Sequence, residues 1–387
     1  LLLNSDEFLN YYYLGLSYLK KNLKKQALDA FKKCILINSN FGIAHYELGK
    51  IYLSILNEEL AMKHFEYAKR NYNTDDLNYK IGMLYYKNEM YLKAMSPIKD
   101  YLLNNLEDIL VLETLGKILM NIERYPEAIN IYLQLIDNNS NNEIYYNNLA
   151  DSYYKLDDFE NALDNYKKTI ELNEEKYEIF LKIGIILNKQ NLFRESENFL
   201  IKSLECNSPT KELLIQLGIA YGGQKKFLQS LLVFKKALKF SLEDPIIHYQ
   251  LAIIYKELNI YDLAIENFLF YLENNKQDDI ALYLIGECYY FQSNFDEAIK
   301  YYKNAAVINN NIKSLYSIGL CYEKMEDNKN AAKYFKNVIK QNPDHVKSRT
   351  KLIKLYLLLN KSREAKKECE IIYMLNRSIY NSIEFCN

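Results

Sequence analysis

Apolar residues along the chain follow helical spacing, in a register that recurs about every 34 residues. The stretch from Asp279 to Asn311 shows the pattern clearly. Its two apolar stripes consist of Leu282, Ile285, Gly286 and Tyr289, and then of Ala298, Tyr302 and Ala305. Spacings of three and four residues predict two amphipathic helices, with a turn from Gln292 to Phe295. Because one helix pair cannot bury its own stripes, we expect it to pack against similar pairs on both sides.

The same register occurs eleven times, each time around a residue that we call the anchor. The anchors are Gly15, Gly49, Gly82, Gly116, Ala150, Gly184, Gly218, Ala252, Gly286, Gly319 and Ile353. Three residues after them stand Tyr18, Tyr52, Tyr85, Leu119, Tyr153, Leu187, Tyr221, Tyr255, Tyr289, Tyr322 and Tyr356. Twelve residues after them stand Ala27, Ala61, Ala94, Ala128, Ala162, Ser196, Ser230, Ala264, Ala298, Ala331 and Ala365. Small residues at two fixed positions indicate close approach of the two helices of each pair.

This register resembles the tetratricopeptide repeat family, whose 34-residue unit pairs Leu-Gly and Tyr on one helix with Ala and Phe on the next. The resemblance implies an all-α fold, a right-handed α-solenoid of about eleven helix-turn-helix units. We expect residues 8–379 to hold the eleven tandem repeats. Residues 1–7 are predicted to be the tail of a preceding repeat, and residues 380–387 a partial repeat or a capping segment.

The sequence departs from the family pattern at the large-residue slot, which lies four residues before each anchor and holds Trp in the family. The chain contains no Trp. The slot holds Tyr11, His45, Asn78, Leu112, Tyr146, Phe180, Leu214, His248, Leu282, Leu315 and Arg349. Arg349 suggests a weaker or terminal repeat. A second departure is Pro97, which predicts a late start or a kink in the second helix of repeat three.

Composition and charge narrow the possible partners. The chain has 49 basic and 50 acidic residues, a formal net charge of −1, which argues against nucleic acid as a general partner. No apolar stretch approaches the length of a membrane-spanning helix. The six cysteines are Cys34, Cys206, Cys288, Cys321, Cys369 and Cys386, and no two have C-x-x-C spacing. Packing in the core is favoured over a disulfide or metal role. A reducing, cytoplasmic location is the expectation.

No set of residues indicates catalysis, a cofactor or a metal. His45, His64, His248 and His345 have no second His or Cys three or four residues away. The segment that begins Gly222-Gly223 lacks the strand and the Gly-Lys-Ser/Thr ending of a phosphate loop. The two glycines are interpreted as a helix stop, with a hinge as the alternative. We therefore predict a protein that is not an enzyme.

The resemblance also implies a binding groove, because first helices line the concave side of such arrays. The candidate groove residues are Tyr12, Leu16, Tyr46, Tyr79, Met83, Ile219, Tyr249, Ile253, Tyr283, Tyr290, Tyr316 and Leu320. Aromatic contact residues of this kind suit an amphipathic helix or an extended apolar peptide. The alternative is that these tyrosines only cover neighbouring helices.

Three functional interpretations remain open from the sequence. The leading one is a non-catalytic scaffold that binds a peptide or helix of a partner protein along the concave groove. The second is the recognition arm of a larger enzyme, for example a glycosyltransferase, whose catalytic domain lies outside this segment. The third is a structural solenoid that associates with itself. The oligomeric state does not follow from these residues.

Overall fold

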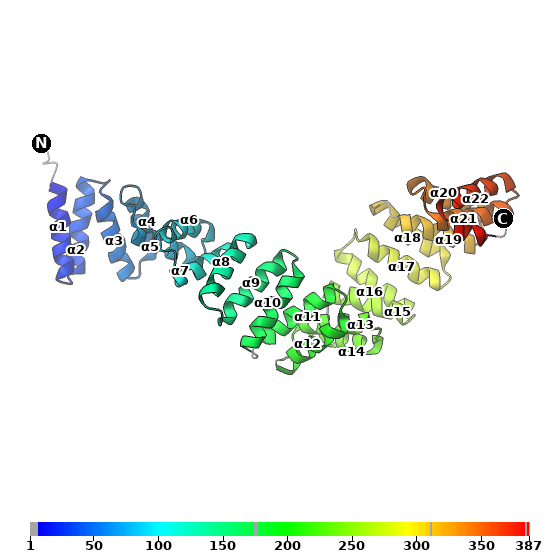
Figure 1. Cartoon of the computed structure of the whole chain (residues 1–387), viewed down its shortest axis with the longest axis horizontal. Coiled ribbons are helices and arrows are strands. Elements are labelled where there is room, and N and C mark those ends of the chain that lie inside the picture. Colours follow the sequence, from blue (N-terminus) through cyan, green and yellow to red (C-terminus); the bar gives the residue numbers. More distant parts are fainter. Residues whose placement is uncertain (1–6, 174–176, 207, 310–311, 384, 387) are drawn as a thin grey trace. The chain divides into compact units, whose positions relative to one another are not determined.

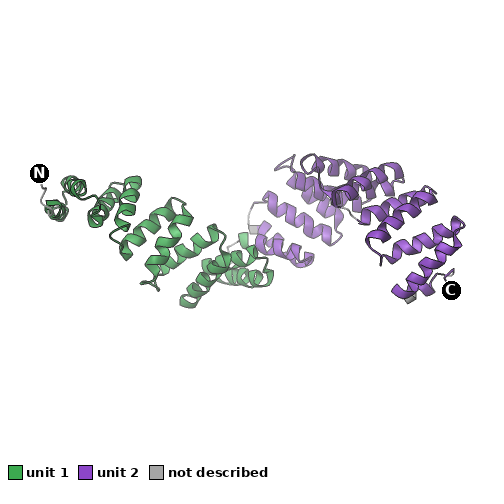
Figure 2. Ribbon diagram, turned by 90° about the horizontal axis from the view of Figure 1, so that it is seen from above, with its two compact units in different colours: residues 1–179 green, residues 180–387 purple. Residues whose placement is uncertain are grey.

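The computed structural model describes residues 7–173, 177–206, 208–309, 312–383 and 385–386, and all secondary structure in these ranges is helical. Across these described ranges there are 23 α-helices and no strand. Figure 1 shows the order of these helices along the chain. The chain divides into two compact units, residues 1–179 and residues 180–387 (Figure 2). Within the described ranges, no helix is long and apolar enough to cross a membrane. The tail predicted at residues 1–7 lies, except for Glu7, outside the described residues.

The helices of unit 1 are short and similar in length. They are α1 (Glu7–Lys20), α2 (Lys24–Ile37), α3 (Gly42–Ser54), α4 (Glu58–Lys69), α5 (Asp75–Lys87), α6 (Tyr91–Leu102), α7 (Ile109–Asn121), α8 (Tyr125–Asn138), α9 (Glu143–Lys155) and α10 (Phe159–Leu172). Odd-numbered helices are the first helices of their pairs, and even-numbered helices are the second. In unit 1, consecutive helices from α1 to α10 pack against one another in sequence order.

Unit 2 continues the same order. Its helices are α11 (Tyr177–Lys189), α12 (Phe193–Cys206), α13 (Lys211–Gly223), α14 (Phe227–Ala237), α15 (Pro245–Glu257), α16 (Tyr261–Asn274), α17 (Asp279–Phe291), α18 (Phe295–Asn309), α19 (Ile312–Lys324), α20 (Asn328–Gln341), α21 (Val346–Leu358), α22 (Ser362–Leu375) and α23 (Arg377–Asn381). The first residues of α11 belong to the end of unit 1. Helix pairs that stack in sequence order confirm the predicted all-α solenoid.

The core of each repeat forms where the anchor meets the residue sixteen positions later, which we call the core slot. The core slots are Phe31, Phe65, Ile98, Tyr132, Tyr166, Leu200, Phe234, Phe268, Tyr302, Phe335 and Cys369, and all are buried. A Cβ atom on Gly49 would lie 2.4 Å from Cε1 of Phe65, which is closer than real contacts allow. Glycine at the anchor therefore lets the two helices close on a large side chain.

The turn inside every pair uses one residue in the left-handed region, seven positions after the anchor. These residues are Asn22, Leu56, Glu89, Glu123, Asp157, Asn191, Lys225, Asn259, Ser293, Glu326 and Asn360, with φ between 56° and 62°. None is glycine, although the conformation costs a side chain about 1–2 kcal/mol. The mixture of residue types explains why the position carries no clear sequence signal.

The two glycines of repeat seven lie inside a helix rather than in its turn. Helix α13 ends at Gly223, as the helix-stop interpretation predicted, but neither glycine has a positive φ. A Cβ atom on Gly223 would lie 2.3 Å from the ring of Phe193 in α12. Gly223 is therefore suited to the close approach of the preceding repeat.

Pro97 does not delay its helix, so the expectation of a late start is wrong. Helix α6 runs from Tyr91 to Leu102 with Pro97 inside it. Ala94, Ile98 and Leu102 on the same helix are buried in the core of unit 1. Their burial offsets the cost of the missing backbone N–H, which is about 3 kcal/mol for an interior proline.

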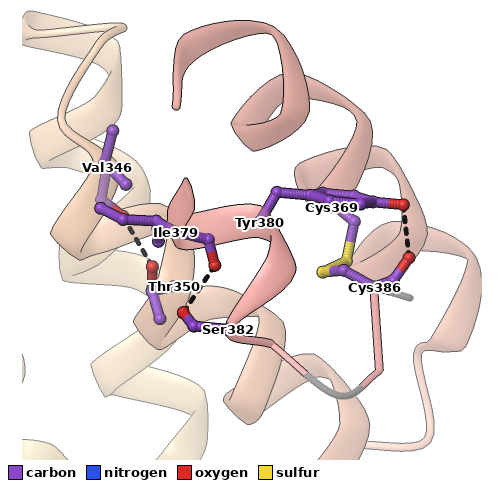
Figure 3. The surroundings of a disulfide bond; sticks show 7 residues. All are labelled: Val346, Thr350, Cys369, Ile379, Tyr380, Ser382 and Cys386. Carbon is purple, nitrogen blue, oxygen red and sulfur yellow. Dashed lines mark hydrogen bonds between the residues drawn. A yellow bond between two sulfur atoms is a disulfide. The ribbon is translucent and has the colours of Figure 1, made fainter. Parts of the chain in front are cut away.

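The cysteines divide into two groups. Cys34, Cys288 and Cys321 are buried, and burial raises the pKa of Cys34 to about 11 and those of the other two to about 12, so these thiols stay neutral. Cys369 and Cys386 form a disulfide, so the expectation that all cysteines serve core packing is wrong for this pair (Figure 3). The side chain of Cys206 lies outside the described part.

The disulfide ties a short tail to repeat eleven. Helix α23 begins after Asn376, whose side chain accepts a hydrogen bond from the amide of Ile379. The chain then turns back, and the Tyr380 hydroxyl donates to the Cys386 carbonyl at 2.5 Å (Figure 3). Ile379, Tyr380 and Ile383 pack against the apolar cluster of α20 to α22. The two cysteines stand 17 positions apart, a separation that no short motif would reveal.

Candidate binding surface

All twelve candidate groove residues lie on first helices, and each is half-buried. In unit 1, Tyr12 and Leu16 lie on α1, Tyr46 on α3, and Tyr79 and Met83 on α5. In unit 2, Ile219 lies on α13, Tyr249 and Ile253 on α15, Tyr283 and Tyr290 on α17, and Tyr316 and Leu320 on α19. We call the surface that these residues share the first-helix face, and consider it separately in each unit.

The tyrosines three residues before the anchors also pack inside their own repeats. Tyr46 contacts the ring of Phe65 with centroids 6.1 Å apart, and Tyr249 contacts Phe268 at 5.7 Å. Tyr12, Tyr283 and Tyr316 meet their core slots in the same way. Each ring therefore has one side in the core and leaves part of its surface exposed, so groove and packing roles are compatible here.

The hydroxyl groups of these tyrosines keep their protons at neutral pH. Burial raises the pKa of Tyr46, and the hydrogen bond that its hydroxyl donates to Asp76 raises it further. Burial likewise raises the pKa values of Tyr249, Tyr283 and Tyr316. Tyr46, Tyr249, Tyr283 and Tyr316 are thus neutral hydrogen-bond donors with apolar rings, a combination that suits protein contacts.

An apolar cleft of about 340 Å³ opens on the first-helix face of unit 2, between α13 and α15. It is lined by Phe193, Gly218, Ile219, Gly222, Gly223, Lys225, Phe227, Phe234, Gln250, Ile253, Ile254 and Glu257. Two of these, Ile219 and Ile253, are candidate groove residues. Gly222 stands four residues after its anchor, where other repeats carry Tyr86, Met120 or Tyr154. Its missing side chain leaves room for the cleft, a consequence that the helix-stop interpretation did not foresee.

Sequence profiles of the tetratricopeptide repeat match residues 10–41, 144–176, 249–311 and 312–345. The chain is a tetratricopeptide repeat protein. A comparison with curated protein sequences found no match to this repeat protein.

Three solved structures with this fold have low sequence identity to the chain. A tetratricopeptide repeat protein from Parabacteroides merdae is 17% identical, with a TM-score of 0.48, over 64% of this chain and 98% of that one. Yeast Tom70 is 15% identical, with a TM-score of 0.40, over 99% and 95%. YrrB, described as a repeat protein with an unusual peptide-binding site, is 20% identical, with a TM-score of 0.41, over 47% and 94%.

The structure also shows how this repeat protein replaces the tryptophan of its family. In three repeats a polar residue in the large-residue slot bonds a residue nineteen positions later, on the second helix, and a backbone carbonyl six positions earlier. His45 pairs with His64 and the Ser39 carbonyl, His248 with Asn267 and the Leu242 carbonyl, and Arg349 with Glu368 and the Pro343 carbonyl. The polar slot residues are thus held as parts of the fold.

The sequence spacing did not reveal the histidine pair of repeat two, because His45 and His64 stand 19 positions apart. Nδ1 of His45 lies 3.0 Å from Nδ1 of His64, and Tyr52 stacks on His64. Burial lowers the pKa of His64 to about 4, with the facing His45 as a further cause. Both rings are therefore neutral at pH 7. Among the described residues, no three His, Cys, Asp or Glu side chains come together as a metal site would require.

Proposed function

We infer that this chain is a scaffold for protein–protein interaction that binds an apolar or amphipathic segment of a partner on its first-helix face. The observation that carries the proposal is the run of half-buried aromatic and aliphatic side chains on successive first helices. Tyrosine offers a large contact area with little rotamer entropy to lose, and its hydroxyl can remain solvated.

The cleft between α13 and α15 supports the same proposal at one defined place. Ile219 and Ile253 present branched aliphatic side chains to an open space beside Gly222. A single aliphatic or aromatic side chain of a partner would fit there, as the main contact residue of a bound peptide does in its groove. The recognition arm of a larger enzyme would use the same face, so the experiment below applies to both interpretations.

The test is binding to an array of amphipathic and extended apolar peptides. We expect Tyr46→Ala with Tyr283→Ala to weaken the best binders by about tenfold or more, as loss of interface aromatics does. Gly222→Leu should block the cleft, because Gly222 lines it. The variant should still fold, because a Cβ atom at this position would meet only the flexible end of Ile254 at 3.0 Å and the Ser230 hydroxyl at 3.5 Å.

Gly222→Ala is the matched control, since it adds only a methyl group and leaves most of the cleft open. Circular dichroism of all variants checks that the fold is kept. If the tyrosine double variant and Gly222→Leu both bind the array as the parent does, the first-helix face is not the binding surface.

A further inference from the structure

A second cleft in unit 2 lies between the second helices α18 and α20. It has a volume of about 810 Å³. Leu315 and Ile318 of α19 form its floor, and Ala306 and Tyr334 stand on its walls. The remaining lining residues are Lys303, Val307, Asn337, Lys340 and Gln341. None of the twelve candidate groove residues lines it, so it belongs to a different surface.

One small residue, Ala306, beside the large-residue slot of the next repeat explains the cleft. Ala306 stands twenty residues after its anchor, where eight other repeats carry a larger aliphatic residue. Those residues are Ile35, Leu102, Ile136, Ile170, Leu204, Leu238, Leu272 and Ile339. Leu315 occupies the large-residue slot of the next repeat and is half-buried, whereas Leu112, Leu214 and Leu282 in that slot are buried. The volume missing at Ala306 therefore leaves Leu315 open to solvent.

The corresponding place between α12 and α14 provides a natural comparison. There, Leu204 stands where Ala306 does, and Leu214 where Leu315 does. The cleft at this place measures about 400 Å³, half the volume found beside Ala306. The difference supports the view that the missing aliphatic side chain contributes to the larger opening.

The rim of the larger cleft is positively charged. Lys303 of α18 and Lys340 of α20 face it from both walls, and both are exposed. Helix α20 also carries Lys329, Lys333 and Lys336, and it contains no Asp or Glu. In the described part of the chain, neither rim lysine takes part in an ion pair, whereas Lys300 of α18 pairs with Glu297. The cleft is thus an apolar hole with a cationic border.

We propose that this cleft binds an acidic peptide segment of a partner protein by taking up one large apolar side chain, with carboxylates on either side of it. The lysine rim complements those carboxylates. The incoming side chain supplies the volume that the family's tryptophan would fill, and this chain has no tryptophan of its own. The proposal is independent of the first-helix face.

The absence of tryptophan also gives a direct test. The probe is a short acidic peptide with one central tryptophan between glutamates, accompanied by versions with alanine for the tryptophan or lysines for the glutamates. Insertion of the indole shifts its emission to the blue and shields it from iodide, without any tryptophan signal from the protein. We expect Ala306→Leu to weaken binding by about tenfold or more. Lys303→Glu with Lys340→Glu should reverse the preference toward the lysine peptide.

Ala306→Leu is expected to fold, because leucine or isoleucine stands at this position in most other repeats. The charge-reversed variant alters only exposed side chains and provides a second, independent arm. Lys236→Glu with Lys239→Glu, at the smaller cleft, is the matched control and should leave binding unchanged.

Four outcomes would overturn the proposal. The first is that the peptide shows no blue shift, and the second is that the Ala306→Leu variant binds it as tightly as the parent protein does. The third is that only the Tyr46→Ala with Tyr283→Ala variant loses binding. The fourth is that the indole inserts regardless of changes at the two rim lysines. Self-association that Ala306→Leu abolishes would assign the cleft to a second copy of the chain. Binding of anionic vesicles in place of the peptide would assign its lysines to a lipid surface.

Discussion

Repeat ten (α19 and α20) and repeat eleven (α21 and α22) follow the same plan, yet they fill the anchor and the core slot in opposite ways. Repeat ten pairs Gly319 with Phe335, and a Cβ atom on Gly319 would lie 2.7 Å from the phenylalanine ring. Repeat eleven pairs Ile353 with Cys369, and both are buried. The larger residue of the pair therefore stands on the second helix in repeat ten and on the first helix in repeat eleven. The comparison indicates that the joint volume of the two positions matters more than either residue alone.

The two repeats also differ at the large-residue slot. In repeat ten, Leu315 lies on the floor of the open cleft beside Tyr334. In repeat eleven, Arg349 is only 6% exposed; it forms an ion pair with Glu368 and donates two hydrogen bonds, of 3.0 and 2.7 Å, to the Pro343 carbonyl. The slot tolerates a charged residue when each nitrogen of its guanidinium group finds an acceptor. In repeat ten the slot opens to the surface because Ala306 of the preceding repeat leaves the leucine partly uncovered.

The largest effect is expected from breaking the volume balance of repeat eleven. In a Cys386→Ser background, which removes the disulfide from every variant, Ile353→Gly should cost about 4 kcal/mol through the cavity and the helix penalty. Cys369→Phe alone should overpack the core and cost about 1–3 kcal/mol. The double variant recreates the pair of repeat ten and should recover most of the loss.

Native-state hydrogen exchange of α21 and α22 measures these effects locally, because stability in a repeat array is a sum over neighbouring units. The matched control is the reverse exchange in repeat ten, Gly319→Ile with Phe335→Cys. Additive effects of the two single changes would contradict the idea that the pair shares one volume.

The next largest effect concerns the buried ion pair. Arg349→Ala removes the partner of Glu368 and of the Pro343 carbonyl, and should destabilise repeat eleven by about 3 kcal/mol. Leu315→Ala in repeat ten should cost less, because that side chain is already half-exposed. Replacing both partners, by Arg349→Leu with Glu368→Tyr, copies the apolar pair of repeat ten and should be nearly neutral. Equal losses for Arg349→Ala and Leu315→Ala in the same exchange experiment would contradict this difference.

The sequence predicts the helix pairs well because their signal is local and repeated. Small anchors, tyrosines three residues later and alanines twelve residues later sufficed to predict the solenoid. The pairing of His45 with His64, or of Arg349 with Glu368, joins two helices across the large-residue slot, so no short spacing reports it. The cleft beside Ala306 needs residues from three helices. The disulfide joins a core slot to a tail whose path the repeat register does not specify.

The smallest expected effect is a pH dependence of the stability of repeat eleven, which arises at the N-terminus of its first helix. His345 is the N-cap of α21, and its Nδ1 accepts a hydrogen bond from the Ser348 amide at 3.2 Å and lies 2.8 Å from the Ser348 hydroxyl. Burial lowers the pKa of His345, and the neighbouring positive charge of Lys347 lowers it further. The ring of Tyr316 packs against it from repeat ten.

Because the folded state binds this proton less readily than the unfolded state, stability should be complete above the unfolded pKa of about 6.5 and decline as the pH falls below it. Protonated Nδ1 cannot accept the amide hydrogen, so the loss should approach that of a helix cap, about 1 kcal/mol. His345→Asn keeps a capping acceptor that does not titrate in this range. The difference in opening free energy of α21 between pH 7 and pH 5, corrected for intrinsic exchange, should therefore be larger in the parent than in His345→Asn. An equal pH dependence in both proteins would show that another group controls the stability of α21.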